Sequence, residues 1–102
     1  MVGGEREPST YVSGERVFGP PLGTFDVEWV AREVQRLTGA DVAQAHRSVE
    51  AAWSVARESG SAEAEQLDEA LSARGVPASV SQVTAALVEG YCTAYDVDPA
   101  AR

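Results

Sequence analysis

The feature that most constrains the fold is an ordered series of helix start and stop signals that begins near residue 26. Three stretches with apolar residues spaced three and four apart end before Gly39, Gly60 and Gly75. No segment after residue 26 alternates with period two, which argues against a sheet there. The sequence therefore predicts an all-α fold, a small four-helix bundle-like domain.

The first two helices have the clearest boundaries. The first follows Thr24 or Asp26 as N-cap and ends before Gly39, and the second opens at Asp41 and ends at Gly60. We expect their buried stripes to contain the following apolar residues: Val27, Val30, Val34 and Leu37 in the first, and Val42, Ala45, Val49, Ala52, Trp53 and Ala56 in the second.

The last two helices are predicted from similar signals. Ser61 is the expected cap of the third helix, which stops at Gly75, and Ser79 with Gln82 forms a capping box for the fourth. The fourth helix is expected to run to about Tyr95. The short connections make consecutive helices neighbours in space.

The first 25 residues lack a helical period but contain several large apolar side chains. We predict three regions: an extended N-terminal arm over residues 1–25, the helical domain over 26–98, and a C-terminal tail over 99–102. Ser13-Gly14 separates two short apolar pieces that could pair as a β-ribbon, which alone is marginal in water. Pro20, Pro21 and Leu22 are placed to fold back over Trp29, which lies away from the apolar stripe of its own helix.

Two adjacent apolar rows occupy the fourth helix. One contains Val80, Val83, Leu87, Tyr91 and Ala94, and the other contains Ala85, Val88, Cys92 and Tyr95. Together the rows cover more than half of the helix, so this helix is either central in the bundle or shared with a partner. We take the first row as core and the second row as the surface that meets a partner. On this interpretation an acidic residue at position 87 unfolds the chain, whereas one at position 88 or 95 damages association.

Charge and length exclude several classes of protein. The 102 residues fit one domain, and the net charge is −8, from 16 acidic and 8 basic residues. No run approaches the roughly 18 apolar residues of a membrane span, and the N-terminus lacks signal-peptide features. We therefore expect an intracellular, cytoplasmic protein. Acidic residues dominate positions 61–98, a charge that disfavours nucleic acid and anionic membranes.

Catalytic and metal-binding patterns are weak in this sequence. The chain has one histidine, His46, and one cysteine, Cys92, so neither has a partner of its own kind. We expect His46 at the edge of the core or facing solvent, and Cys92 as a small buried side chain. No phosphate-binding glycine motif is present. The sequence predicts a non-enzymatic protein without a cofactor or metal.

Residues 65–87, EQLDEALSARGVPASVSQVTAAL, resemble a helix-turn-helix segment of winged-helix repressors and transposase-type DNA readers. The resemblance implies a DNA-binding regulator in which a recognition helix presents these residues: Ser79, Ser81, Gln82 and Thr84. The predicted recognition helix carries no Arg or Lys, although such residues supply most phosphate contacts. A further alternative is that the acidic residues over 61–98 mimic nucleic acid and block a DNA-binding protein.

A second resemblance covers residues 34–52, VQRLTGADVAQAHRSVEAA. This stretch is similar to the first two helices of a ubiquitin-associated-type domain, as also found at the start of bacterial elongation factor Ts. That resemblance implies a small helical protein-binding module.

The leading hypothesis from the sequence is a protein–protein interaction module, a small accessory or structural subunit of a larger assembly. Its partner is either another protein or further copies of the same chain. The candidate partner-binding residues are Tyr11, Val12, Val17, Phe18, Trp29, Val88 and Tyr95, together with Cys92 on the second row.

Overall fold

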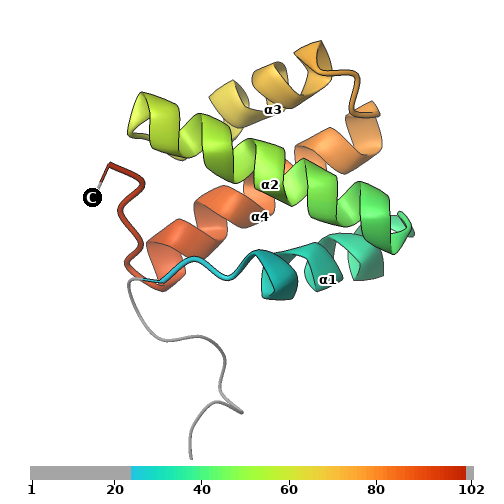
Figure 1. Cartoon of the computed structure of the whole chain (residues 1–102), viewed down its shortest axis with the longest axis horizontal. Coiled ribbons are helices and arrows are strands. Elements are labelled where there is room, and N and C mark those ends of the chain that lie inside the picture. The colour runs from blue at the N-terminus through green and yellow to red at the C-terminus, as the bar shows by residue number, and fades with distance from the viewer. Residues whose placement is uncertain (1–23, 101–102) are drawn as a thin grey trace, which may run out of the picture.

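The computed structural model describes residues 24–100, and within that range it contains four α-helices and no strand. The helices are α1 (Val27–Thr38), α2 (Val42–Ser59), α3 (Ala64–Ala73) and α4 (Ala78–Ala94). Figure 1 shows them packed against each other, which confirms the predicted all-α, bundle-like fold. The predicted β-ribbon lies outside the described residues.

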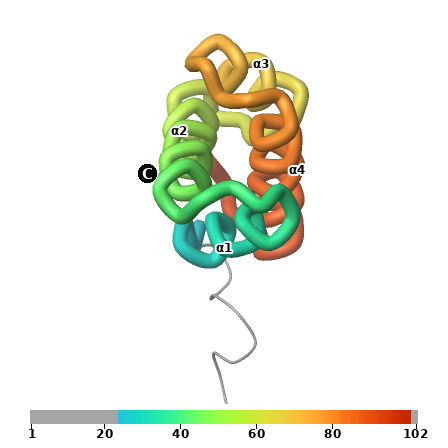
Figure 2. Tube along the Cα trace, turned by 90° about the vertical axis from the view of Figure 1, so that its right-hand side faces the viewer, coloured from blue at the N-terminus to red at the C-terminus, as the bar shows by residue number. Residues whose placement is uncertain are grey.

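The helices form three layers, and the α2–α4 pair is the middle layer. Figure 2 shows α2 and α4 side by side, with α3 on one side of this pair and α1 on the other. Both α1 and α3 contact α2 and α4, whereas α1 and α3 do not pack on each other. The fourth helix therefore contacts all three others, which explains why so much of its surface is apolar.

The ends of α1 and α2 follow the sequence signals. Asp26 accepts a hydrogen bond from the Trp29 backbone N–H at 3.1 Å, and Asp41 accepts one from the Gln44 N–H at 2.8 Å. Both helices end in a left-handed glycine, at Gly39 (φ 77°) and at Gly60 (φ 75°). Asp26 and Asp41 are therefore confirmed as N-caps, because each satisfies an otherwise unpaired N–H group.

The predicted caps of the last two helices are wrong. The third helix begins at Ala64 with Glu63 rather than Ser61 at the N-cap position, and α4 begins at Ala78 after Pro77. Within the described residues neither helix has a side-chain cap, so the Ser79–Gln82 capping box does not form. Pro77 has the extended backbone (φ −57°, ψ 143°) that starts the helix one position before Ser79.

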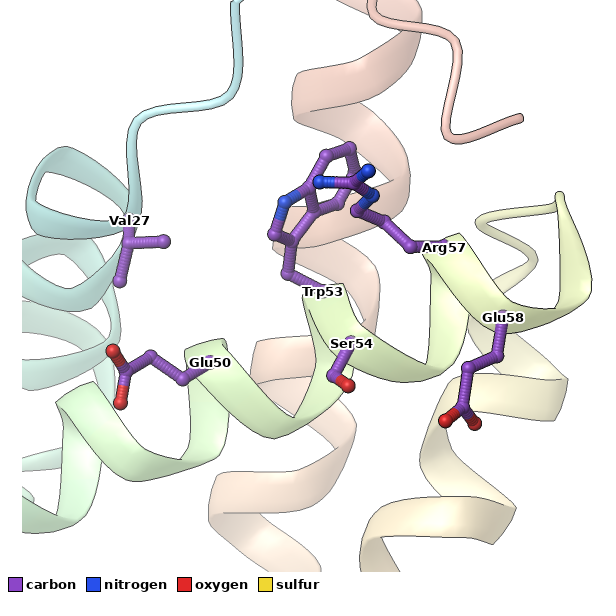
Figure 3. Close-up of a pocket in the computed structure, with 6 residues that line it drawn as sticks. All are labelled: Val27, Glu50, Trp53, Ser54, Arg57 and Glu58. Carbon is purple, nitrogen blue, oxygen red and sulfur yellow. The ribbon is translucent and has the colours of Figure 1, made fainter. Parts of the chain in front are cut away.

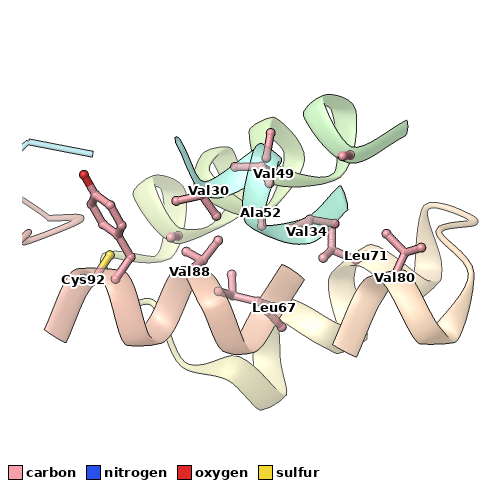
Figure 4. Close-up of a cluster of buried hydrophobic side chains, with 14 of the residues drawn as sticks. Val30, Val34, Val49, Ala52, Leu67, Leu71, Val80, Val88 and Cys92 are labelled. Carbon is pink, nitrogen blue, oxygen red and sulfur yellow. The ribbon is translucent and has the colours of Figure 1, made fainter. Parts of the chain in front are cut away.

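The core is built mostly from valine and alanine side chains of α1, α2 and α4, together with Leu67 and Leu71 of α3 (Figure 4). Its buried apolar members are Val30, Ala31, Val34, Ala45, Val49, Ala52, Ala56, Leu67, Leu71, Val80, Ala85, Val88, Tyr91, Cys92 and Val97. Two stripe predictions are wrong: Leu37 is 52% exposed and Val42 is 67% exposed. These residues lie at the α1–α2 corner, beyond the part of each helix that its neighbours cover.

The assignment of the two rows on α4 is wrong in part: Val80 and Tyr91 of the first row are buried as predicted, but Ala85, Val88 and Cys92 of the second row are buried too. Val88 is fully buried, whereas Leu87 and Val83 are only partly covered and Ala94 is exposed. The two rows are adjacent on the helix surface, and contacts with α1, α2 and α3 place the buried face near Val88. The small polar residues Ser81 and Thr84 complete that face.

The chain continues to pack after α4 ends. Asp96 adopts a left-handed backbone (φ 56°), and the Val97 N–H donates to the Cys92 carbonyl at 2.9 Å. Val97 and Pro99 are buried, so the packed part of the chain includes the first residue of the predicted tail. This segment covers the end of the bundle near Gly60, where Ala100 lies.

Candidate functional site

An apolar groove between α1 and α4 is the surface feature with the most uniform chemistry. It has a volume of about 280 Å³, and its lining residues are Trp29, Ala86, Leu87, Gly90, Tyr91, Ala94 and Tyr95. None of these seven side chains is charged. The volume lies just below the roughly 300–1,000 Å³ of small-molecule pockets, so the groove has room for one or two side chains.

Three aromatic rings form one wall of the groove. The ring centroids of Trp29 and Tyr91 are 5.7 Å apart, those of Trp29 and Tyr95 are 6.4 Å apart, and those of Tyr91 and Tyr95 are 4.7 Å apart. The tilted and edge-on arrangements are those that aromatic pairs prefer. Because each ring is held by the next, the wall is already formed before anything binds to it.

Tyr91 fixes this wall to the start of the described chain. Its hydroxyl donates a hydrogen bond to the Thr24 carbonyl at 2.9 Å, and its ring meets Phe25 edge-on at 5.0 Å. Phe25 in turn stacks on Trp53 of α2, with centroids 4.3 Å apart and ring planes 7° apart. The aromatic cluster therefore joins α1, α2 and α4 at one end of the bundle.

Two groups beside the groove have raised pKa values. Burial raises the pKa of the Tyr91 hydroxyl to about 12 and that of the Cys92 thiol to about 11. Both groups are therefore neutral near pH 7, and Cys92 is not the accessible thiolate that a nucleophilic cysteine requires. The chemistry of this region is apolar contact.

The structure brings together two of the residues that the sequence singled out. Trp29 and Tyr95 come from different helices and line the same groove. The prediction for Val88 is wrong, because this fully buried side chain is unable to reach a partner while the chain is folded. Cys92 of the same row is 7% exposed and packs in the core. Tyr11, Val12, Val17 and Phe18 lie outside the described residues.

The sequence analysis missed the groove residues on α4. The sequence pattern places Leu87, Tyr91 and Ala94 in the expected core row and gives Ala86 and Gly90 no role. The available signal was the spacing of Ala86, Gly90 and Ala94, which places small residues four apart on one side of the helix. Such a row leaves a depression beside a large neighbour such as Trp29.

Two of the four residues that were predicted to contact DNA are buried in the structure. Ser81 and Thr84 are fully buried, so they are unable to face DNA in the folded chain. The Ser81 hydroxyl faces α3, where it contacts the carbonyl and the carboxylate of Asp68. Ser79 and Gln82 are exposed, but they lie on a helix whose exposed charge is the acidic Glu89.

A second hollow lies on the α2 side of the aromatic cluster and has mixed chemistry. It measures about 620 Å³ and is lined by Val27, Glu50, Trp53, Ser54, Arg57 and Glu58. Figure 3 shows the Arg57 side chain beside the Trp53 ring, while Glu50 and Glu58 point away from it. This larger hollow places charges of both signs around an open surface, without a nucleophile and base directed at each other.

His46 lies next to this region and is half-exposed, which confirms its predicted place at the edge of the core. Its Nδ1 is 3.5 Å from Glu50 Oε1, and its Nε2 is 3.8 Å from Glu28 Oε2. Both distances exceed those of a good hydrogen bond. No group of three His, Cys, Asp or Glu residues in the described part of the chain is arranged to hold a metal ion.

Among residues 24–100, none of the helices combines the length and the apolar character that crossing a bilayer requires. Comparison with protein-family models, with curated proteins and with solved structures gives no match for this chain. The chemistry and geometry of the groove are therefore the basis on which a function is inferred.

Proposed function

We propose that this protein is a non-enzymatic interaction module that binds another protein through the groove between α1 and α4. The observation that carries the proposal is that three large, half-buried apolar side chains, Trp29, Leu87 and Tyr95, line one uncharged groove. Large apolar side chains that gather in one depression mark interaction sites more often than side chains scattered singly. Trp and Tyr are also the residues that contribute most to binding at protein interfaces.

The groove suits an apolar side chain of a partner better than a reacting substrate. The seven lining residues offer two tyrosine hydroxyls and no ionised group, and the Tyr91 hydroxyl is already bonded to Thr24. The lining includes no carboxylate, imidazole, amine or thiol, the groups that general acid–base and nucleophilic reactions use most often. A partner that fills the groove would displace water from the rings of Trp29 and Tyr95.

DNA binding and nucleic-acid mimicry receive less support. Ser81 and Thr84 are unable to contact DNA while buried, and α4 packs against three other helices rather than projecting from the bundle. The acidic residues of α3 and α4 are a surface that repels phosphate. Mimicry would require spaced carboxylates in a groove-like arrangement, whereas the apolar groove is the feature that the structure offers a partner.

Photo-crosslinking in the native host tests this proposal. A photoreactive phenylalanine derivative replaces the exposed Ala94 in the groove, and in a matched control it replaces Val42, which is 67% exposed at the opposite end of the bundle. We expect a discrete protein adduct from position 94 and none from position 42. An adduct with a second copy of the chain also supports the proposal.

A second variant links the adduct to the groove. Adding Tyr95→Asp to the position-94 probe places a charge on the aromatic wall and should abolish capture. Capture that is equal at positions 94 and 42, or unaffected by Tyr95→Asp, contradicts binding at this groove. Helical circular dichroism of each purified variant shows whether the fold is retained.

A further inference from the structure

A third hollow lies between α2 and the connection from α3 to α4, and its chemistry differs from that of the apolar groove. Its volume is about 380 Å³, within the range of small-molecule pockets. Gln44, Arg47 and Ser48 line it from α2, and Arg74 lines it from the C-cap of α3. It shares no lining residue with the groove, so it is a separate candidate site, which we call the arginine hollow.

The two arginines give the arginine hollow its positive charge. Neither Arg47 nor Arg74 forms an ion pair with any residue between 24 and 100, although this chain has 16 acidic residues and 8 basic ones. Within the described residues, the Arg74 guanidinium donates to the Ala70 carbonyl of α3, at 3.3 Å. Because a guanidinium has five N–H donors, most of the donors on both side chains are free for a ligand.

One acidic residue, Glu50, also lines the arginine hollow. Its carboxylate is directed toward His46, with Glu50 Oε1 at 3.5 Å from His46 Nδ1, and Figure 3 shows the side chain beside Val27 of α1. Two arginines and one glutamate therefore leave the lining with a net positive charge.

The start of α4 adds backbone donors next to the arginines. Pro77 lines the hollow at the N-cap position of this helix, and α4 has no side-chain cap. The Val80 and Ser81 N–H groups both donate to the Pro77 carbonyl, whereas those of Ala78 and Ser79 have no acceptor among the described residues. Free N–H groups at a helix N-terminus, together with the helix dipole, favour an anion.

Ser48 is a second, independent indication of a ligand in this hollow. The residue is 3% exposed and lines the hollow. Its hydroxyl makes no hydrogen bond with the described residues, whereas Thr38, Ser59 and Thr93 each donate to a carbonyl of their own helix. A buried hydroxyl without a partner costs free energy, and a ligand oxygen in the hollow would supply the missing acceptor.

We propose that the arginine hollow binds a phosphate group, either as inorganic phosphate or as the phosphate of a small ester. Two guanidinium groups, the free N–H groups of α4 and the Ser48 hydroxyl come from different elements, which suits an anion with several oxygen atoms. A phosphate ester near pH 7 carries a charge of about −1.5 to −2, whereas a carboxylate has two oxygens and one charge and would leave donors unused. The site is independent of the groove, so this proposal and the proposed function fail separately.

NMR titration of the ¹⁵N-labelled full-length chain tests the site. Sodium phosphate, glycerol phosphate and sodium acetate are added separately at constant ionic strength. We expect at least one phosphate probe to shift the amide signals of Ala78 and Ser79 and the side-chain Nε–H signals of Arg47 and Arg74, with saturation in the millimolar range. The indole N–H signal of Trp29 in the groove should stay fixed, and acetate should bind at least about tenfold more weakly.

Arginine variants link these shifts to the arginine hollow. Arg47→Gln and Arg74→Gln should each weaken phosphate binding about tenfold, because each removes charge-assisted hydrogen bonds. Arg57→Gln is the matched control, since it removes the same charge from an exposed arginine of α2 that lines the second hollow instead. It should leave the dissociation constant unchanged. Helical circular dichroism of each variant shows whether the fold is retained.

The order of affinities identifies the source of the phosphate group. Tighter binding of glycerol phosphate assigns the site to phosphate esters, and tighter binding of inorganic phosphate assigns it to the free ion. Shifts that stay linear with concentration for both phosphate probes overturn the proposal. Binding of acetate as tight as that of phosphate, or equal weakening by Arg57→Gln and Arg47→Gln, also overturns it.

Discussion

Ser81 and Thr84 are small polar residues on the buried face of α4, and their hydroxyl groups differ in hydrogen bonding. The Ser81 hydroxyl contacts the Asp68 carbonyl at 3.1 Å and also the Asp68 carboxylate, which ties α4 to α3. The Thr84 hydroxyl is buried without a hydrogen-bond partner among the described residues. One hydroxyl therefore stabilises the packing of two helices, while the other is desolvated without compensation.

Thr84→Val is expected to stabilise the chain by about 1 kcal/mol, because it removes a buried unpaired hydroxyl while keeping a branched side chain. Ser81→Ala should have the opposite effect, with a loss of about 1 kcal/mol. Urea denaturation followed by circular dichroism measures both free energies of unfolding. A loss of stability in Thr84→Val would indicate that its hydroxyl is bonded.

Leu87 and Val88 are neighbours in sequence with opposite environments. Val88→Asp should unfold the chain, since an unpaired buried carboxylate costs several kcal/mol and the whole stability of a domain is about 5–15 kcal/mol. Leu87→Asp should leave a cooperative fold, because that side chain lies at the groove surface. Thermal melts compare the two variants. A melt of Leu87→Asp as poor as that of Val88→Asp would place residue 87 in the core.

At the scale of the helix, local signals predicted α1 and α2 best. Asp26, Asp41, Gly39 and Gly60 act through hydrogen bonds and backbone angles within one turn, so the sequence contains all the information needed. The face that α4 buries depends instead on three other helices. Two adjacent apolar rows were visible in the sequence, but their periodicity does not say which row the neighbours cover.

The groove was predictable only in part, because it depends on contacts between helices rather than on a local sequence pattern. Trp29 and Tyr95 were recognised as apolar residues outside their expected stripes. Their proximity depends on the crossing of α1 and α4, and no local pattern fixes that crossing. Ser79 illustrates the limit of a short motif: the Ser-x-x-Gln spacing is present, but the preceding Pro77 starts the helix too early for a capping box.

Helix capping gives a matched pair of variants. Asp41→Ala should destabilise the chain by about 0.5–2 kcal/mol, because the backbone N–H of Gln44 loses its acceptor. Ser79→Ala should change stability by less than about 0.5 kcal/mol, since this exposed serine caps no helix in the described residues. Chemical denaturation measures both. A large loss from Ser79→Ala would show that the capping box forms in solution.

At the scale of the whole molecule, stability should fall at alkaline pH. Burial raises the pKa of Tyr91 from 10.0 to about 12 and that of Cys92 from 9.0 to about 11. The folded chain keeps these protons at pH values where the unfolded chain has lost them. The folded state then binds more protons, so stability decreases as pH rises.

The stability that the protonated Tyr91 and Cys92 side chains contribute is fully present below about pH 9 and is lost between about pH 9 and pH 12. Thermal melting across that interval should show a steady fall in Tm. The fall should be shallower in a Cys92→Ala, Tyr91→Phe double variant, which lacks both titrating groups. Identical pH profiles for the double variant and the parent chain would assign the alkaline loss to other residues.

The bond between the Tyr91 hydroxyl and the Thr24 carbonyl joins residues 67 positions apart. In kinetic terms, the packing of α1 on α4 closes the longest loop in the described structure, whereas α2–α3 and α3–α4 pair between neighbours in sequence. Loop-closure entropy delays such distant contacts, so α1 should dock on α4 after the transition state for folding. Tyr91→Phe should then raise the unfolding rate and leave the refolding rate unchanged. Stopped-flow measurements across a range of urea concentrations separate the two rates, and slower refolding would place the α1–α4 contact in the folding nucleus.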